Sequence, residues 1–144
     1  MEQKVTSQQF DNLVEINQIK IEAGNQNEFD GLLQSGQARL KDSRLKTLAL
    51  ESRFDLAYNA AHAISLSALR WHGYRSENRY IVFQCLQHTI GVGSEVWRVL
   101  AHCHNLRNRG EYEGYLDINN RLVVDLINAT EAVLAKVQKL GPIP

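Results

Sequence analysis

The sequence predicts an all-α domain, an antiparallel up-and-down bundle of about five helices. Proline, which interrupts helices, is absent from the chain until Pro142. Apolar residues recur at intervals of three and four rather than two, which is the spacing of a helix with one buried side. We therefore divide the chain into an N-terminal arm over residues 1–24, a helical bundle over residues 25–140 and a frayed tail over residues 141–144.

The arm has the least regular pattern. Phe10, Leu13 and Val14 are spaced for one helical turn, whereas the isoleucines after them fit neither the helical nor the strand period well. We treat residues 1–24 as a segment outside the bundle. The first helix is then expected over residues 27–42, where apolar residues resume at helical spacing.

The second helix, expected over residues 47–72, has the clearest pattern in the chain. Its apolar residues follow an unbroken spacing of four and three, which draws one stripe along a long helix. Gly73 comes directly after it and tolerates the left-handed conformation in which helices often end. The stripe consists of Leu50, Phe54, Ala57, Ala61, Ile64, Ala68 and Trp71.

Three further helices are expected over residues 77–90, 94–109 and 119–139. Ser76 is a candidate N-terminal cap for the first of them, and Gly110 is a natural place for the second to bend or stop. The buried side of the 94–109 helix leads to an arginine, which therefore continues an inward-facing line: Val96, Leu100, Cys103 and then Arg107.

Short connections make consecutive helices antiparallel, so two helix ends and two helix starts should meet at one pole of the bundle. The expected cationic residues there are Arg70, His72, Arg75, Arg79, Arg107, Arg109 and Arg121. A guanidinium group fits phosphate, and nearby tyrosines offer stacking faces, so the pole suits RNA or a nucleotide. The alternative is a solvated helix end with ordinary salt bridges, because four acids share the region: Glu77, Glu111, Glu113 and Asp117.

Composition excludes several classes of protein. Acidic and basic side chains balance at 16 each, so no overall field draws the chain to DNA or to an anionic membrane. The sequence lacks the layout of a signal peptide and an apolar run long enough to span a membrane, and only Cys85 and Cys103 are cysteines. A reduced cytoplasmic protein is expected. We expect neither a metal site nor a cofactor, since His102 and His104 diverge on a helix and no glycine-rich phosphate loop occurs.

The most informative stretch is Leu106-Arg107-Asn108-Arg109-Gly110-Glu111-Tyr112. Two other motifs precede it, Ala57-Tyr58-Asn59-Ala60-Ala61 and Trp71-His72-Gly73-Tyr74-Arg75. In this order and spacing they resemble the HEPN superfamily of small prokaryotic helical bundles, and within it a bacterial subgroup with an Arg-Asn-x-x-Glu/Asp-Tyr motif. The resemblance extends over residues 28–139 and implies that the bundle is HEPN-like.

The resemblance also implies a homodimer and, for many family members, a metal-independent ribonuclease in toxin–antitoxin, CRISPR or other defence systems. The family motif is an arginine followed, after a short spacer, by a histidine. Arg107 matches that arginine and Asn108 the polar residue after it, but Tyr112 stands where the histidine is expected. A phenol ionises near pH ~10 and is a poor proton acceptor at neutral pH. His104, three residues before Arg107 on the same helical face, is a substitute to weigh against a purely structural histidine.

Three functions remain open. The favoured one is a dimer that binds RNA or nucleotide phosphate in a bacterial stress, defence or toxin–antitoxin context. The second is a metal-independent endoribonuclease that uses Arg107 with Tyr112 or His104. The third is a protein-interaction module that partners a nucleotidyltransferase or an antitoxin. The expected ligand-binding residues are Arg107, Asn108, Arg109, Glu111, Tyr112, Arg75 and Arg79.

Overall fold

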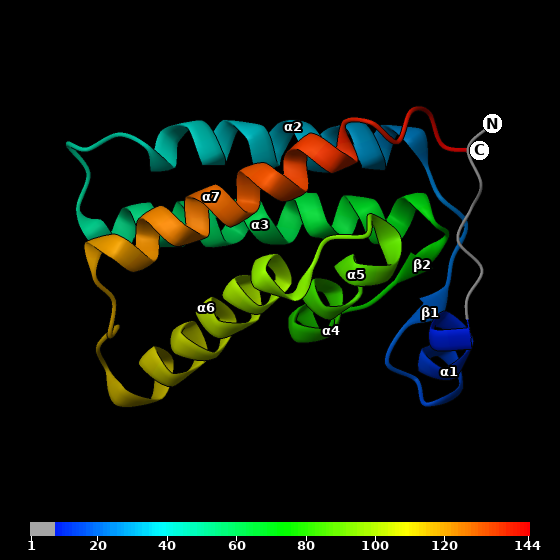
Figure 1. Cartoon of the computed structure of the whole chain (residues 1–144), viewed down its shortest axis with the longest axis horizontal. Coiled ribbons are helices and arrows are strands. Elements are labelled where there is room, and N and C mark those ends of the chain that lie inside the picture. The colour runs from blue at the N-terminus through cyan, green and yellow to red at the C-terminus, as the bar shows by residue number, and fades with distance from the viewer. Residues whose placement is uncertain (1–7) are drawn as a thin grey trace.

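The computed structural model of the chain describes residues 8–144 and confirms the all-α helical bundle (Figure 1). The part of the expected arm over residues 1–7 lies outside the described residues. The long helices are α2 (Gln26–Ser43), α3 (Leu50–Trp71), α6 (Ser94–Glu113) and α7 (Asn120–Val137). The short elements are α1 (Gln8–Glu15), β1 (Lys20–Ile21), β2 (Tyr74–Arg75), α4 (Arg79–Gln84) and α5 (Leu86–Thr89).

Helix α3 is the centre of the bundle, and its predicted apolar stripe is buried from Phe54 to Trp71. Helices α2 and α7 pack along it, while α4 and α6 cover its other side (Figure 1). The contact with α2 is close because Gly36 faces Ile64: a Cβ atom at Gly36 would lie 2.5 Å from Ile64 Cγ1. The lack of a side chain at Gly36 therefore allows α2 and α3 to lie this close together.

The chain takes a different path between α3 and α4 from the one that the sequence predicts. Residues 73–78 contain β2 and run back along α3 instead of making a short turn. Two hydrogen bonds fix the direction of the next two helices. At the start of α4, Arg79 Nη1 donates to Asn59 Oδ1, and at the end of α5 the Thr89 carbonyl accepts from His72 Nε2. The α4–α5 segment is therefore parallel to α3.

This path makes the prediction of a single arginine-rich pole wrong. Helix α6 runs toward the start of α3, where Arg107 lies 4.0 Å from Asp55. Arg70 is fifteen positions further along α3, which corresponds to about 22 Å of helix. The cause is the link that contains β2, which carries the chain from His72 back to the level of Asn59, where α4 begins.

Two predicted helix ends also need correction. Asn78, not Ser76, caps α4, because its side chain accepts a hydrogen bond from the Ile81 amide. Helix α6 continues through Gly110 and ends at Gly114, which has the left-handed φ of 83°. The expected 77–90 helix is divided at Cys85 into α4 and α5.

The described part of the arm packs against the end of α3. Strand β1 pairs with β2 in antiparallel register, with Lys20 opposite Arg75. Phe10 and Ile19 are buried in a second hydrophobic cluster together with side chains of α3, β2 and α4. The C-terminal tail, which the sequence predicts to be frayed, is held as well: the Gly141 carbonyl accepts from Trp71 Nε1 at 3.1 Å.

Candidate anion-binding site

Helices α3, α4 and α6 meet around Tyr58, whose side chain is fully buried. Phe54 precedes it on α3 and Phe83 of α4 contacts it edge-on, so the phenol ring is held on several sides. The Tyr58 hydroxyl forms a 2.8 Å hydrogen bond with His104 Nδ1 of α6. Tyr58 is thus a fixed platform that ties α3 to α6.

Two arginines from different helices converge on this ring. Arg79 of α4 and Arg107 of α6 place their guanidinium carbons 5.5 Å and 5.0 Å from the ring centroid of Tyr58. Both distances are within the range of a cation–π contact. Arg79 donates to a neutral amide, Asn59 Oδ1, at 3.2 Å, and Arg107 is only loosely paired with Asp55 and Glu111, at 4.0 Å and 3.9 Å. Among residues 8–144, neither guanidinium group therefore has a carboxylate contact shorter than 3.9 Å.

Two histidines lie among these arginines. Burial, followed by the charges of Arg79, His104 and Arg107, lowers the pKa of His62 to about 4. Burial and the charges of Arg79 and Arg107 also lower the pKa of His104 below its ordinary value. Both imidazoles are therefore predominantly neutral at pH 7, and the positive charge of the site comes from its arginines.

The partners of His104 suit either protonation state of its ring. Its Nδ1 atom contacts the Tyr58 hydroxyl and its Nε2 atom lies 3.1 Å from Asn108 Nδ2. A hydroxyl can donate or accept, and a carboxamide presents a donor or an acceptor by turning over. Burial and the neighbouring arginines thus oppose protonation of His104, whereas its hydrogen bonds do not.

The structure brings together only part of the predicted site. Arg107, His104, Asn108 and Arg79 belong to the Tyr58 cluster. We define the Tyr58 cluster as these four residues with three that sequence reasoning did not assign to the site: Tyr58, Asn59 and His62. Glu111 joins only through its loose ion pair with Arg107.

Three predicted residues lie away from this cluster or face solvent. Tyr112 is 93% exposed and Arg109 is also exposed, so neither helps to enclose a ligand at Tyr58. Arg75 belongs to a different group at the other end of α3. There it pairs with Glu22 at 2.7 Å and also with Glu28.

We call this second group the Glu22/Glu28 network. Arg70, only 2% exposed, donates from Nε to Glu28 Oε1 at 2.8 Å, and its Nη2 atom lies 3.4 Å from Glu22 Oε2. The hydrogen bond from Arg75 lowers the pKa of Glu22. Burial acts to raise the pKa of Glu28, but its hydrogen bonds with Arg75 and Arg70 prevail and lower it. Both arginines of this network are closely matched by carboxylates.

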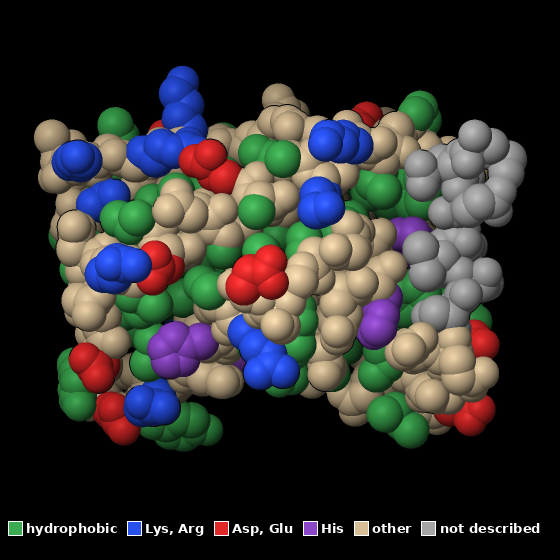
Figure 2. Space-filling model, viewed as in Figure 1, with side chains coloured by type: hydrophobic (Ala, Val, Ile, Leu, Met, Phe, Trp, Pro, Cys, Tyr) green, Lys and Arg blue, Asp and Glu red, His purple; other side chains and the backbone are tan. Residues whose placement is uncertain are grey.

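Other features of the described residues limit the chemistry of the site. Within residues 8–144, no group of three or more His, Cys, Asp and Glu side chains is arranged to hold a metal ion. Cys85 and Cys103 are buried, and burial raises the pKa of each thiol to about 12. Over the same residues, no helix is both long and apolar enough to cross a membrane. On the face shown in Figure 2, acidic and basic side chains are interspersed.

Comparison with protein-family models, curated proteins and solved structures found no match. The chemistry of the site itself is therefore what indicates a function.

Proposed function

We propose that this protein binds RNA through its phosphate groups at the Tyr58 cluster. The observation that carries the proposal is the convergence of Arg79 and Arg107 on one buried ring, where no carboxylate of the described residues pairs closely with either. Guanidinium groups that lack a tight internal partner are suited to a ligand phosphate, to which they donate paired hydrogen bonds.

The positive charge of the site at pH 7 comes from its two guanidinium groups. The pKa values of His62 and His104 are lowered, so these imidazoles contribute polar atoms rather than positive charge at pH 7. Asn59 and Asn108 add carboxamides at the edge of the cluster. Each phosphodiester group of RNA carries a single negative charge, which two guanidinium groups can match.

The resemblance to the HEPN superfamily supports the same function and adds a homodimer in a bacterial stress, defence or toxin–antitoxin setting. Arg107 and Asn108, which carry the resemblance, both belong to the Tyr58 cluster. Light scattering at micromolar protein concentration tests the assembly: a mass of two chains is expected, and a monomer would contradict this part of the proposal.

RNA binding is tested by fluorescence anisotropy with a labelled oligouridylate about ten nucleotides long, in EDTA and at low salt. We expect Arg79→Gln and Arg107→Gln each to weaken binding about tenfold and to reduce the salt slope by about one. Arg39→Gln is the charge-matched control, because Arg39 is exposed on α2, across α3 from the site. Equal affinity of all four proteins would contradict RNA binding at the Tyr58 cluster.

Metal-independent cleavage of RNA is a second candidate, favoured by the position of His104. Its imidazole shares Tyr58 with Arg107 and is mainly neutral at pH 7, as a general base must be. Incubation of labelled RNA in EDTA tests this function. Cleavage that is lost in both His104→Gln and Arg107→Gln but kept in His88→Gln would establish it, whereas intact RNA that remains bound leaves binding alone.

An interaction module that partners a nucleotidyltransferase or antitoxin is the third function that the sequence leaves open. The Tyr58 cluster supports it less, because its open guanidinium groups favour an anionic ligand. If the wild-type protein fails to bind RNA at low salt, the interaction module becomes the favoured function.

A further inference from the structure

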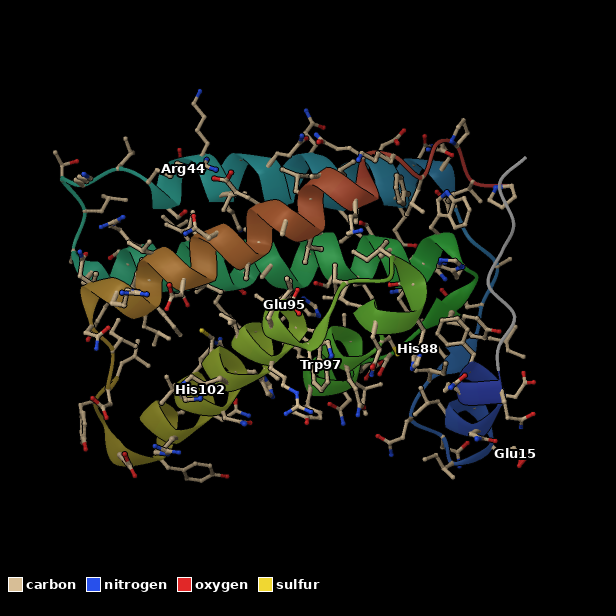
Figure 3. The ribbon with its side chains drawn as sticks, viewed as in Figure 1. Glu15, Arg44, His88, Glu95, Trp97 and His102 are labelled. Atoms are coloured by element: carbon tan, nitrogen blue, oxygen red, sulfur yellow. The ribbon has the colours of Figure 1, made fainter. Side chains whose placement is uncertain are left out.

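A polar groove lies along the seam between α4–α5 and α6, beside the Tyr58 cluster. Its volume is about 600 Å³, and its lining includes Tyr80, Gln84 and Gln87 on one side and Trp97, Arg98 and Asn105 on the other. Figure 3 labels Trp97 on α6, the helix that forms one wall of the groove. None of the residues that line it is acidic.

The groove adjoins the cluster along both helices, although the residues that line it are not themselves members of the cluster. Tyr80 follows Arg79 in α4, and Asn105 follows His104 in α6, so the same ends of both helices contribute to the groove and to the site. The α6 wall extends from Trp97 to Asn105, eight positions or about 12 Å of helix. A ligand bound at the two arginines can therefore continue along this seam.

The lining has the chemistry of a surface for unpaired bases. The Arg98 guanidinium lies 5.4 Å from the ring of Trp97, and Tyr80 is 36% exposed, so a planar cation and a phenol ring border the groove. Bases stack on aromatic rings and on guanidinium planes with little dependence on sequence. Gln84, Gln87 and Asn105 supply carboxamides that can both donate to and accept from base edges.

We propose that the α4–α6 groove holds a short single-stranded segment of the RNA whose phosphate binds at the Tyr58 cluster. The inference rests on the proposed function and adds to it the class of RNA and the path of the strand. A stacked strand advances about 3.4 Å per nucleotide, so a wall of about 12 Å matches about four nucleotides. Single-stranded RNA should bind in preference to a duplex, whose paired bases cannot enter the groove.

The experiment measures the affinity of oligouridylates of about two, four and eight nucleotides, and of a duplex of about eight base pairs, by anisotropy in EDTA. Affinity should rise steeply up to about four nucleotides and only slowly beyond, and the duplex should bind at least about fivefold more weakly than the longest single strand. Duplex binding of equal strength would overturn the proposal.

Substitutions in the groove test this inference separately from the proposed function. Tyr80→Leu should weaken binding of the longest strand at least about fivefold, while Tyr80→Phe, which keeps the ring, should restore it. Arg98→Gln should weaken binding severalfold and lower the salt slope by about one, unlike Arg39→Gln. Circular dichroism establishes that each variant is folded.

Failure of the groove proposal is distinguishable from failure of the proposed function. If Arg79→Gln and Arg107→Gln weaken binding while Tyr80→Leu and Arg98→Gln do not, RNA binds at the cluster and the groove proposal is overturned. If the wild-type protein binds none of the oligonucleotides, the proposed function fails first. If Arg39→Gln weakens binding as much as Arg98→Gln, the attraction is general to the surface and the groove has no special role.

Discussion

Two pairs of arginines on this protein differ in how completely they are neutralised. Arg70 and Arg75 make close ion pairs with Glu22 and Glu28 near the end of α3. Arg79 and Arg107, nearer its start, share the ring of Tyr58 and have only neutral or distant partners. The difference indicates that an arginine-rich sequence by itself does not mark a ligand site, since its carboxylate partners decide whether its charge is free to bind.

The Glu22/Glu28 network also binds the backbone. Arg70 donates from Nη1 to the carbonyls of Glu22 and Tyr74, and from Nη2 to the carbonyl of Ala23. These contacts join the segment after β1 to β2 and to α3. The network therefore has a structural role, while the arginines of the Tyr58 cluster keep donors that no carboxylate holds closely.

Substitution of Arg70 should have the largest effect on the stability of the protein. Arg70→Met removes a buried cation and leaves two carboxylates and three carbonyls without that partner, so we expect a loss of about 3–5 kcal/mol in the free energy of unfolding. Arg107→Met, at a half-exposed position, should lose less than about 1 kcal/mol. Urea unfolding measures both, and similar losses would contradict the division into a structural and a functional pair.

Acid should reduce the contributions of the two regions to stability over different pH ranges. The folded-state pKa of His62 is about 4, below its ordinary value of 6.5, so unfolding takes up a proton between these pH values. The lowered pKa of His62 makes its full contribution to the free energy of unfolding above pH 6.5. This contribution decreases as the pH falls, by about 2 kcal/mol at about pH 5. The pKa values of Glu22 and Glu28 are also lowered, but their contribution is lost only below their ordinary value of 4.5.

Urea unfolding at several pH values between about 7.5 and 5 tests these two windows. His62→Gln should flatten the decline in this range relative to wild type, whereas Glu22→Gln should leave its slope nearly unchanged. A wild-type slope that persists in His62→Gln would show that another group, such as His88 or His104, dominates the acid response.

The helices were predictable because each has a local cause. The stripe of α3 follows from apolar spacing, and its end follows from Gly73, which has a left-handed φ of 87°. The direction of α4 was not predictable in this way. It depends on the link over residues 73–78, in which Tyr74 and Arg75 pair with β1, more than fifty positions earlier in the chain.

The candidate site was predicted in part for the same reason. Arg107, Asn108 and His104 are neighbours on one helix, so their spacing was informative. Tyr58 and His62 lie four positions apart on α3, but nothing local indicated that α4 and α6 would cover them. The predicted grouping of Arg75 with Arg107 required a short turn between α3 and α4. In the structure, the link that contains β2 stands in place of that turn.

Loss of the Tyr58 hydroxyl should have a moderate effect. Tyr58→Phe keeps the ring beneath Arg79 and Arg107 but removes the hydrogen bond to His104 Nδ1, so we expect a loss of about 1 kcal/mol in the free energy of unfolding. RNA affinity should change by less than about threefold, because the charges remain. A tenfold loss of affinity with unchanged stability would instead place the hydroxyl in contact with the ligand.

The smallest effect should be a pH dependence of RNA affinity that originates at His104. The groups facing it are Tyr58 and His62 of α3, Arg79 of α4 and Arg107 of α6, and the charges of the two arginines help to lower its pKa. A bound phosphate offsets those charges, so the pKa of His104 should be higher in the complex and binding should take up protons. Affinity should then rise about threefold as pH falls from about 7.5 to about 6.

His104→Gln should abolish this rise, and His88→Gln, which changes a histidine on α5 beside α1, should preserve it (Figure 3). The oligouridylate used as probe should lack terminal phosphates, since these titrate in the same range. Proton uptake measured by calorimetry in buffers of different ionisation enthalpy gives an independent value. Uptake that persists in His104→Gln would assign the proton to His62, the other imidazole whose pKa the same arginines lower.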